Sequence, residues 1–258
     1  MYQQHFGLTC SPLGKDSPAL WQDTAFKDFK LQFLNLLKTP GVGVLTGEPG
    51  VGKTAAIRHI VKPLNPHQYQ VVYLSETNFT SFDIYRQIAL NLGLVPAHRC
   101  AQLWRDLKKY IKDSVDNQRR QLLFIIDEAQ SLPLNFFRDF PSFLNFDFGA
   151  RDMLTVWFIG HPVLSNILKR NSYIALSSRV QARCEFQPIQ DRERFTQLIE
   201  HGFKTAGCQT KLVSDSGIEI LRMASHGRPR LVSLIIINSM QLAVQKNLNH
   251  LPDELLQE

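Results

Sequence analysis

Hydrophobic and polar positions along this chain follow two alternating periods. Short continuous apolar runs, typical of strands buried on both faces, alternate with stretches in which apolar residues recur every three or four positions, as in helices. The runs predict strands at 43–46, 70–75, 122–126 and 155–159, and a short strand near 183–186. Strands that alternate with helices in this way are typical of a parallel sheet covered by helices on both faces.

The helical pattern fills the intervals between these strands. Helices are predicted at 53–61, 81–91, 102–115, 136–145 and 163–169. Each of these segments follows one strand and precedes another, except that two of them lie between the second and third strands. The sequence therefore predicts an α/β domain with a five-stranded core over residues 1–188, including an N-terminal strip over 1–40.

After Pro188 the strand pattern stops and only helices are expected. Three helical patterns cover 191–206, 214–225 and 229–245. Asp191 and Ser214 are suited to be N-caps, because their side chains accept hydrogen bonds from the free amides of a first helical turn. Gly207 and Gly227 are suited to end helices. Residues 189–258 are therefore predicted to form a small helical subdomain.

The composition is that of a soluble, folded protein. Of 258 residues, 44% are apolar and 20% are charged, and the net charge is +6 with a pI of about 9.2. A basic protein favours an anionic partner, commonly nucleic acid, although each short basic pair fits a solvated helix face equally well. The apolar run at 234–237 is too short to span a membrane, and residues 1–13 do not resemble a signal peptide. A cytoplasmic protein without a membrane segment is expected.

A phosphate-binding loop follows the first strand. Gly47, Gly52, Lys53 and Thr54 match the pattern G-x-x-x-x-G-K-[ST], and the match lies between a strand and a helix as the motif requires. Backbone amides of such a loop and the helix dipole hold phosphate, while Lys53 is expected to neutralise its charge and Thr54 to ligate Mg²⁺. The residues expected to hold nucleotide are Gly47, Glu48, Pro49, Gly50, Val51, Gly52, Lys53, Thr54 and Ala55.

Two acidic residues follow the third strand. The segment LLFIIDEAQ delivers Asp127 and Glu128 at the carboxyl end of a buried run, where open α/β sheets bind ligands. Asp127 is expected to hold Mg²⁺ through water, and Glu128 to orient and deprotonate an attacking water. The separation of Lys53 and Asp127 leaves room for another strand, which favours the additional-strand ATPases over the simplest nucleoside kinases and GTPases.

Four further positions are candidates for contact with the transferred phosphoryl group. His161 follows the fourth strand in TVWFIGHP, where it is either a reporter of the γ-phosphate or a turn residue. Arg179 follows in LSSRV, and Arg230 in HGRPR together with Arg228. Guanidinium groups commonly stabilise charge on a transferring phosphoryl, either within one subunit or from a neighbour.

These motifs together resemble the ExeA/TniB/TnsC-type AAA+ ATPases. The resemblance extends over nearly all of the chain, including YQQHFGL, LTGEPGVGKT, LLFIIDEAQ, LNFDFGARDMLTVWFIGHP, SSRV, RFTQLIEHGFKTAG and HGRPRLVSLIIINSMQLA. It implies a P-loop NTPase of the ASCE class, with a five-stranded parallel sheet in strand order 5-1-4-3-2 and a C-terminal helical lid. ATP and Mg²⁺ are the implied ligands.

The same resemblance implies roles for individual residues. Arg179 matches the arginine finger that reaches ATP on the adjacent subunit, and Arg230 matches the sensor-2 arginine. Trp21 would lie beside the adenine. Relatives often carry Gln where this chain has His161, so the chain departs from the family pattern at this position. ATP at a subunit interface would join the protein into a homo-oligomer, as a ring or a helical filament.

Two functions follow from this family. The chain stops at Glu258, whereas ExeA continues into a membrane span, so the favoured expectation is a transposition regulator, related to IstB and MuB. Such a protein would oligomerise on duplex DNA irrespective of sequence, recruit a transposase and engage a target-selection protein, with slow ATP hydrolysis driving disassembly. The alternative is an ExeA-like ATPase that acts in secretin assembly without DNA.

The DNA contacts of such a filament are expected on helices between the second and third strands. The basic residues there are Arg99, Arg105, Lys108, Lys109, Arg119 and Arg120. For each of them a merely solubilising role is an equal alternative.

Overall fold

The computed structural model describes residues 2–76, 79–208 and 210–257, which form two compact units. The first, called here the sheet unit, comprises Thr24–Gly47 and Ile57–Glu185. The second, called the helical unit, comprises Met1–Asp23, Glu48–Ala56 and Phe186–Glu258. Each unit is described by itself.

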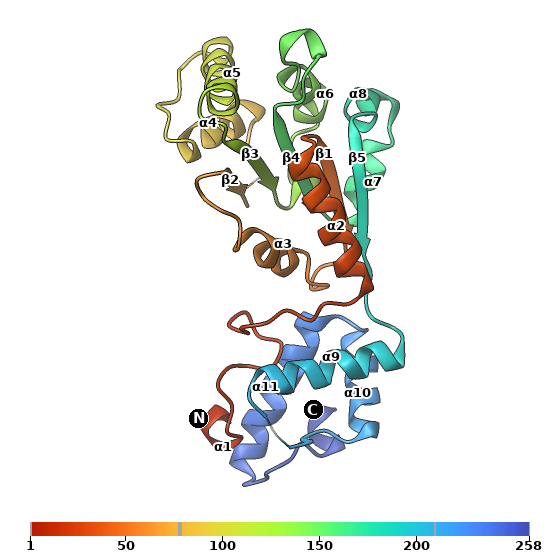
Figure 1. Cartoon of the computed structure of the whole chain (residues 1–258). Helices are drawn as coiled ribbons and strands as arrows, with labels where there is room; N and C mark the ends of the chain where they lie inside the picture. The colour runs from red at the N-terminus through yellow and green to blue at the C-terminus, as the bar shows by residue number, and fades with distance from the viewer. Residues whose placement is uncertain (1, 77–78, 209, 258) are drawn as a thin grey trace. The chain divides into compact units, whose positions relative to one another are not determined.

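Five strands form one parallel sheet, as the sequence predicts (Figure 1). They are β1 (Val42–Gly47), β2 (Tyr69–Leu74), β3 (Gln121–Ile126), β4 (Leu154–Gly160) and β5 (Val180–Phe186). Their order is β2-β3-β4-β1-β5, which is the predicted order read from the other edge. The central strands are buried along almost their whole length, because helices cover both faces of the sheet.

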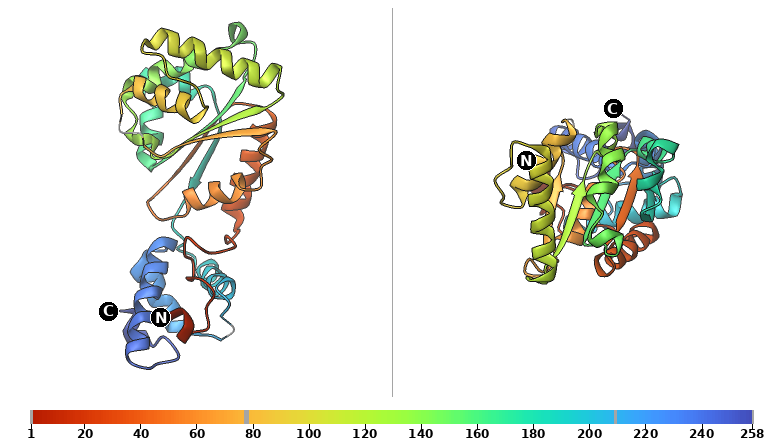
Figure 2. Two further views of the ribbon diagram at one scale, coloured as in Figure 1. Left: turned by 90° about the vertical axis from the view of Figure 1, so that its left-hand side faces the viewer. Right: turned by 90° about the horizontal axis from the view of Figure 1, so that it is seen from above.

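One face of the sheet is covered by the larger helical layer (Figure 2). Alternate strand residues such as Phe124, Val156 and Phe158 belong to an apolar cluster with this layer. The layer contains α4 (Ser81–Asn91), α5 (Cys100–Asp116), α6 (Leu134–Phe143), α7 (Pro162–Leu168) and α8 (Ile174–Ser177). Short 3-10 turns connect these elements: η1 (Ala129–Ser131), η2 (Asp147–Gly149) and η3 (Asn171–Tyr173). The predicted helix at 81–91 is confirmed to the residue, and the others differ by one or two residues at their ends.

The opposite face carries α2 (Thr24–Lys38), which the sequence analysis did not predict. Its buried residues Phe26, Phe29, Phe33, Leu36 and Leu37 recur at helical spacing, so the signal was present in the sequence. Phe33 stacks on the Trp157 ring with centroids 5.2 Å apart, and Phe29 meets the same ring edge-on at 5.2 Å. Helix α3 (Lys53–Val61) follows β1, with the bounds that the sequence predicts.

Gly43 is required by this aromatic packing. It pairs with Trp157 across β1 and β4, and a Cβ at Gly43 would lie 2.6 Å from atoms of the indole ring. A side chain at position 43 would therefore displace Trp157, which is fully buried in the core.

The helical unit is built around α9 (Arg192–Thr205), α10 (Asp215–Ser225) and α11 (Pro229–Gln245). Smaller elements complete it: α1 (Tyr2–His5) and η4 (Asp253–Leu256). The predicted N-caps are confirmed, since the side chain of Asp191 accepts from the Arg194 amide and that of Ser214 from the Gly217 amide. Gly207 and Gly227 follow their helices with φ of 87° and 69°.

The N-terminal strip divides between the two units. Leu8 and Cys10 are buried in the apolar core of the helical unit, and the Ser233 hydroxyl donates to the carbonyl of Pro12 at 2.9 Å. The sequence-based division assigned the whole strip 1–40 to the α/β domain, whereas only its second part, α2, packs on the sheet. The division of the strip follows its apolar residues, because each part buries them against a different core.

None of the helices formed by the described residues combines the length and the apolar character needed to cross a membrane.

Candidate nucleotide site

The loop between β1 and α3 has the backbone of a phosphate cradle. Gly50 and Gly52 have φ of 84° and 103°, a conformation that side chains disfavour, and nothing lies within 4 Å of a Cβ built at Gly52. The Lys53 side chain is buried, and its amine donates to the carbonyl of Glu48 at 2.9 Å. Helix α3 begins at Lys53, so the positive end of its dipole lies at this loop, next to Thr54 and Ala55.

These features fit a nucleotide polyphosphate. The loop offers backbone amides, the positive end of a helix dipole and a lysine amine. Among the described residues no group of three or more His, Cys, Asp or Glu side chains could hold a metal. The Thr54 hydroxyl and the Asp127 carboxylate are oxygen ligands of the kind that Mg²⁺ takes, with phosphate and water completing its shell.

The start of α11 contacts this loop within the helical unit. The Arg230 amide donates to the Gly50 carbonyl at 3.2 Å, and its Cβ lies 3.1 Å from the position of a Cβ on Gly50. Arg228, the N-cap of α11, forms an ion pair with Glu48 in which Nη2 and Oε2 are 2.5 Å apart. These contacts place the segment HGRPR beside the phosphate loop. The side chain of Arg230 is exposed beside the loop.

The Glu48–Arg228 ion pair should contribute only modestly to stability. Its side chains are 45% and 33% exposed, so water screens the attraction. A double-mutant cycle of Glu48→Ala and Arg228→Ala, measured by chemical unfolding, should give a coupling of about 0.2–1 kcal/mol that decreases with salt. A cycle of Glu48→Ala with Arg192→Ala is the control, and a Glu48–Arg228 coupling no larger than this control would contradict the pair.

Asp127 occupies a buried position in the sheet unit directly after β3. Its side chain is 4% exposed; Oδ2 accepts from the Tyr73 hydroxyl at 2.8 Å, and Oδ1 accepts from the Glu128 amide at 2.9 Å. Burial and the carboxylate of Asp127 both raise the pKa of Tyr73 well above its usual range. The sequence analysis missed Tyr73. Its place one residue before the end of β2, the strand that pairs with β3, is the signal that could have found it.

Glu128 is exposed and has a left-handed backbone with φ of 50°. Its Oε2 accepts from Nε2 of Gln130 at 2.7 Å, and Oε1 of Gln130 accepts from the His161 amide at 3.0 Å. The structure thus joins Glu128 and His161, two predicted site residues, through a third that was not predicted. His161 is the N-cap of α7, and its ring is partly buried.

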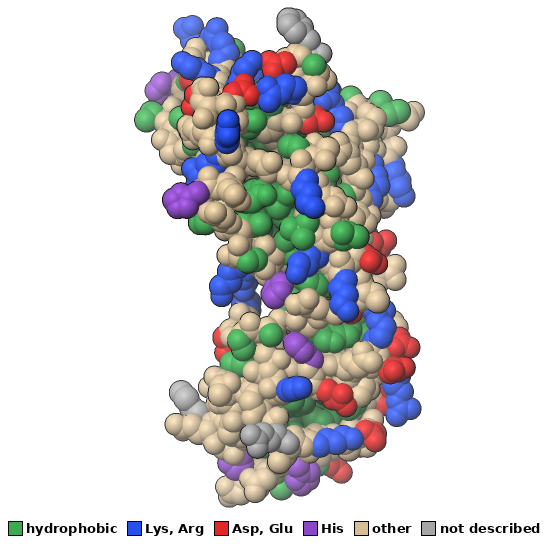
Figure 3. Space-filling model, in the orientation of Figure 1, with side chains coloured by type: hydrophobic (Ala, Val, Ile, Leu, Met, Phe, Trp, Pro, Cys, Tyr) green, Lys and Arg blue, Asp and Glu red, His purple; other side chains and the backbone are tan. Residues whose placement is uncertain are grey.

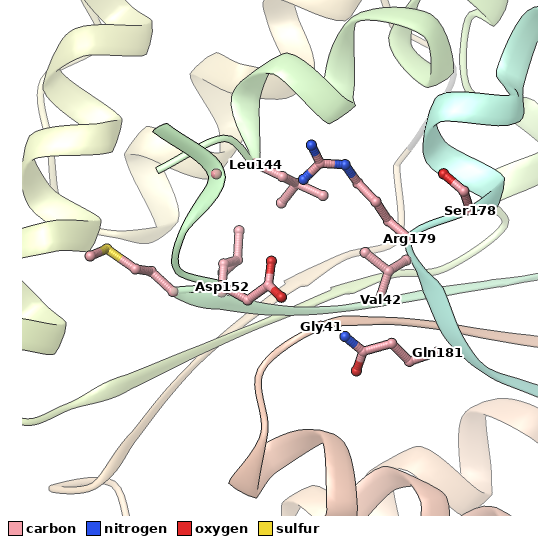
Figure 4. Close-up of a pocket in the computed structure, with 10 residues that line it drawn as sticks. Gly41, Val42, Leu144, Asp152, Ser178, Arg179 and Gln181 are labelled. Carbon is pink, nitrogen blue, oxygen red and sulfur yellow. The ribbon is translucent and has the colours of Figure 1, made fainter. Parts of the chain in front are cut away.

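Arg179 lies at the amino ends of the strands, whereas Asp127 and Glu128 lie at their carboxyl ends. It precedes β5 and borders a cavity of about 370 Å³ lined by residues at the amino ends of β1, β4 and β5. Figure 4 shows its side chain extending into this cavity together with Asp152. Asp127 and Glu128 follow the carboxyl end of β3, and a strand of this length spans about 20 Å. Arg179 therefore does not reach the acidic pair of its own chain.

Trp21 belongs to the helical unit, where it is partly buried against the apolar core. The neighbouring Asp23 forms an ion pair with Arg194 of α9. This contact holds the end of the strip that carries Trp21 to the helical unit, which also contains loop residues Glu48–Ala56.

The six predicted DNA contacts differ in what they offer to a partner. Lysine and arginine side chains gather on the sheet unit around α5, interspersed with acidic ones (Figure 3). Lys108 donates to the carbonyls of Ser142 and Asn145 at the end of α6, at 2.9 and 3.0 Å, and burial lowers its pKa. Its amine is therefore engaged by the protein itself. Arg120 is also half-buried, whereas the remaining four are exposed: Arg99, Arg105, Lys109 and Arg119.

Comparison with known proteins finds a named relative and many solved structures that share the fold of this chain. The chain is similar to General secretion pathway protein A of Aeromonas hydrophila, with 27% identity over 243 residues. The match covers 91% of this chain and 43% of that protein, so the chain spans less than half the length of this relative.

Solved structures with the same fold include Cdc6p from Pyrobaculum aerophilum, with a TM-score of 0.68 and 16% identity over 96% of this chain and 68% of that one. The Aeropyrum pernix ORC1 protein in complex with DNA has a TM-score of 0.71 and 14% identity over 95% and 66%. The Thermotoga maritima RuvB Holliday junction branch migration motor has a TM-score of 0.57 and 16% identity over 92% and 68%. At these identities the likeness shows the fold alone.

The family model described as an AAA domain matches residues 36–168, slightly more than half of the chain. That range contains the phosphate loop, the acidic pair after β3 and four of the five strands. The match, the loop and the sheet order together show that the chain belongs to the AAA domain family.

Proposed function

We propose that this protein is an ATPase that oligomerises with ATP bound, assembles on duplex DNA and regulates transposition. The observation that carries the nucleotide part is the phosphate loop itself, with its two left-handed glycines, its buried lysine and the contact of α11 with Gly50. The loop residues 47–55 would hold the phosphates, and Trp21 would lie by the adenine.

Hydrolysis would use groups of the phosphate loop, of the segment after β3 and of α11. Lys53 would neutralise charge on the phosphates, and Glu128 would accept a proton from the water that attacks the γ-phosphorus. Thr54 and Asp127 would hold Mg²⁺, which supplies charge stabilisation to the phosphoryl group when bound. Arg230 would contact the γ-phosphate from α11, and His161 is a second candidate for sensing it.

The position of Arg179 supports assembly of several copies. Because this arginine lies at the amino edge of the sheet, it would stabilise the phosphoryl group bound by a neighbouring protomer and not its own. Nucleotide would then join copies into a ring or filament. Light scattering of the purified protein at saturating ATP and Mg²⁺ tests this, and a protein that stays monomeric both alone and with DNA would contradict it.

The DNA part of the proposal is supported by the net charge of +6 and by the exposed basic residues around α5. Similar folds include an ORC1 protein solved in complex with DNA. Anisotropy of labelled duplex DNA, measured with and without a non-hydrolysable ATP analogue, tests the function. Binding that depends on nucleotide supports it, and absence of binding in both states excludes it.

A second candidate function is the assembly of a protein complex in secretion, without DNA. The similarity to General secretion pathway protein A over 91% of this chain favours it. The same anisotropy experiment separates the two candidates, since this alternative expects nucleotide-dependent oligomers that ignore DNA. A transposase and a target-selection protein would be partners only under the first proposal.

Removing the exposed charges of α5 and the turn after it should weaken DNA binding at all sequences. For the triple variant Arg105→Gln, Lys109→Gln and Arg119→Gln, the slope of log affinity against log salt should fall by about 0.9 for each lost phosphate contact. The matched control replaces Lys169 and Arg170, an exposed pair after α7, with glutamine. Equal slopes for the triple variant and the parent would exclude this surface.

Lys108→Met should instead lower thermal stability, because Lys108 bonds the end of α6.

A further inference from the structure

The side chain of Gln130 connects two ends of the sheet that carry predicted site residues. Its Nε2 donates to Oε2 of Glu128 at 2.7 Å, and its Oε1 accepts from the backbone amide of His161 at 3.0 Å. Glu128 follows β3, and His161 follows β4 and caps α7. One half-buried amide thus links the proposed general base to the segment that follows β4.

The orientation of this amide is determined by its partners. A backbone N–H can only donate, so the oxygen of Gln130 must face His161. The NH₂ group must then face Glu128, where a carboxylate can only accept. Reversing the amide would place two donors together at one end and two acceptors at the other. Gln130 therefore presents a donor to the carboxyl oxygen of Glu128 and an acceptor to the amide of His161.

Gly160 provides the space that Gln130 occupies. A Cβ on this last residue of β4 would lie 2.3 Å from Oε1 of Gln130 and 3.4 Å from its backbone nitrogen. The φ of Gly160 is not in the left-handed region, so the backbone would accept alanine there. The absence of a side chain at position 160 is consequently explained by the approach of Gln130.

Glu128 benefits from being held. Its side chain is exposed, and its backbone has an uncommon left-handed conformation that sets the direction in which the side chain leaves the chain. An exposed glutamate samples several rotamers, of which few suit proton transfer from one particular water. The bond from Gln130 restricts this sampling.

We propose that Gln130 is a positioning residue, which holds the Glu128 carboxylate against the end of β4 in the geometry that activates water. This inference rests on the proposed ATPase function and adds a dependence of that activity on the spacing between the ends of β3 and β4. It assigns no direct contact of Gln130 with ATP.

Removing the amide should lower turnover without changing nucleotide affinity. Gln130→Ala should reduce kcat by about 10- to 100-fold, the range expected for a misplaced catalytic group, with KM within about twofold of the parent. Gly160→Ala should give a similar decrease without removing any polar group, because the added methyl displaces Gln130. The matched control is Gln87→Ala on α4, also a half-buried glutamine, which should keep the parent kcat.

A double-mutant cycle tests whether Gln130 acts through Glu128. In the Glu128→Ala background, measured in single-turnover reactions, adding Gln130→Ala should lower the residual rate by less than twofold. A parent-like kcat in Gln130→Ala, or a further large loss in the Glu128→Ala background, overturns the inference. A parent protein that binds ATP without hydrolysing it overturns the proposed function instead, so the two failures are distinguishable. Thermal unfolding of each variant separates a loss of fold from a loss of positioning.

Discussion

Lys53→Ala should weaken ATP binding by at least about 100-fold, since a buried ammonium that bonds phosphate contributes on the order of 3 kcal/mol. The side chain of Lys53 is 7% exposed and lies within the loop, where its amine bonds the Glu48 carbonyl. Alanine removes the only lysine of the loop, and the remaining backbone amides cannot supply a full positive charge. Isothermal titration with ATP and Mg²⁺ measures the change.

The same substitution should abolish assembly. If ATP joins protomers, a protein that cannot bind it remains monomeric by light scattering at any nucleotide concentration that assembles the parent. Lys62→Ala is the control: this exposed lysine follows α3 and should leave binding and assembly unchanged. Parent-like affinity in Lys53→Ala, with circular dichroism showing a folded protein, would refute the assignment of the loop.

Glu128→Gln should separate binding from hydrolysis. The substitution preserves the size of the side chain and removes its capacity to take a proton, which should lower kcat by about 10²- to 10⁴-fold while the affinity for ATP stays within about twofold. Oligomers formed with ATP should then persist, because the reaction that would disassemble them is blocked. Phosphate release and the lifetime of oligomers after dilution measure the two effects.

A neutral substitution of an exposed glutamate elsewhere provides the control for Glu128→Gln. Glu200→Gln on α9 should hydrolyse ATP like the parent. Should Glu128→Gln also keep the parent rate, Glu128 is not the general base. Gln130 would then have no general base to position. If turnover falls but the oligomers still dissociate at the parent rate, hydrolysis is not the timer of disassembly.

Local features of the chain were read correctly where the residues themselves set the conformation. The bounds of α3, α4 and α11 and the caps at Asp191 and Ser214 follow from periodicity and from side chains that satisfy free amides, both of which are interactions between neighbours in sequence. Helix α2 carried the same kind of signal at Phe26, Phe29 and Phe33, and the error there was one of interpretation. The strand order was predicted from the family resemblance and agrees with the structure. It could not come from the strand patterns, because these do not say which strands pair.

The contacts of the candidate site were beyond prediction because they join residues far apart in sequence. Arg228 pairs with Glu48, Tyr73 bonds Asp127, and Lys108 bonds the end of α6 in place of facing solvent. A basic side chain on a helix gives the same sequence pattern whether it faces water or donates to the carbonyls of another helix.

Residue types and their spacing within one segment were enough to predict the phosphate loop, the acidic pair after a buried strand and the lengths of most helices. Three other features came from the folded chain: Gln130 lies between Glu128 and His161, Arg179 lies at the amino ends of the strands whereas Asp127 follows the carboxyl end of β3, and residues 2–23 pack with the C-terminal helices. The reason is physical: such contacts form when separate apolar surfaces are buried together, and no local pattern records which surfaces will meet.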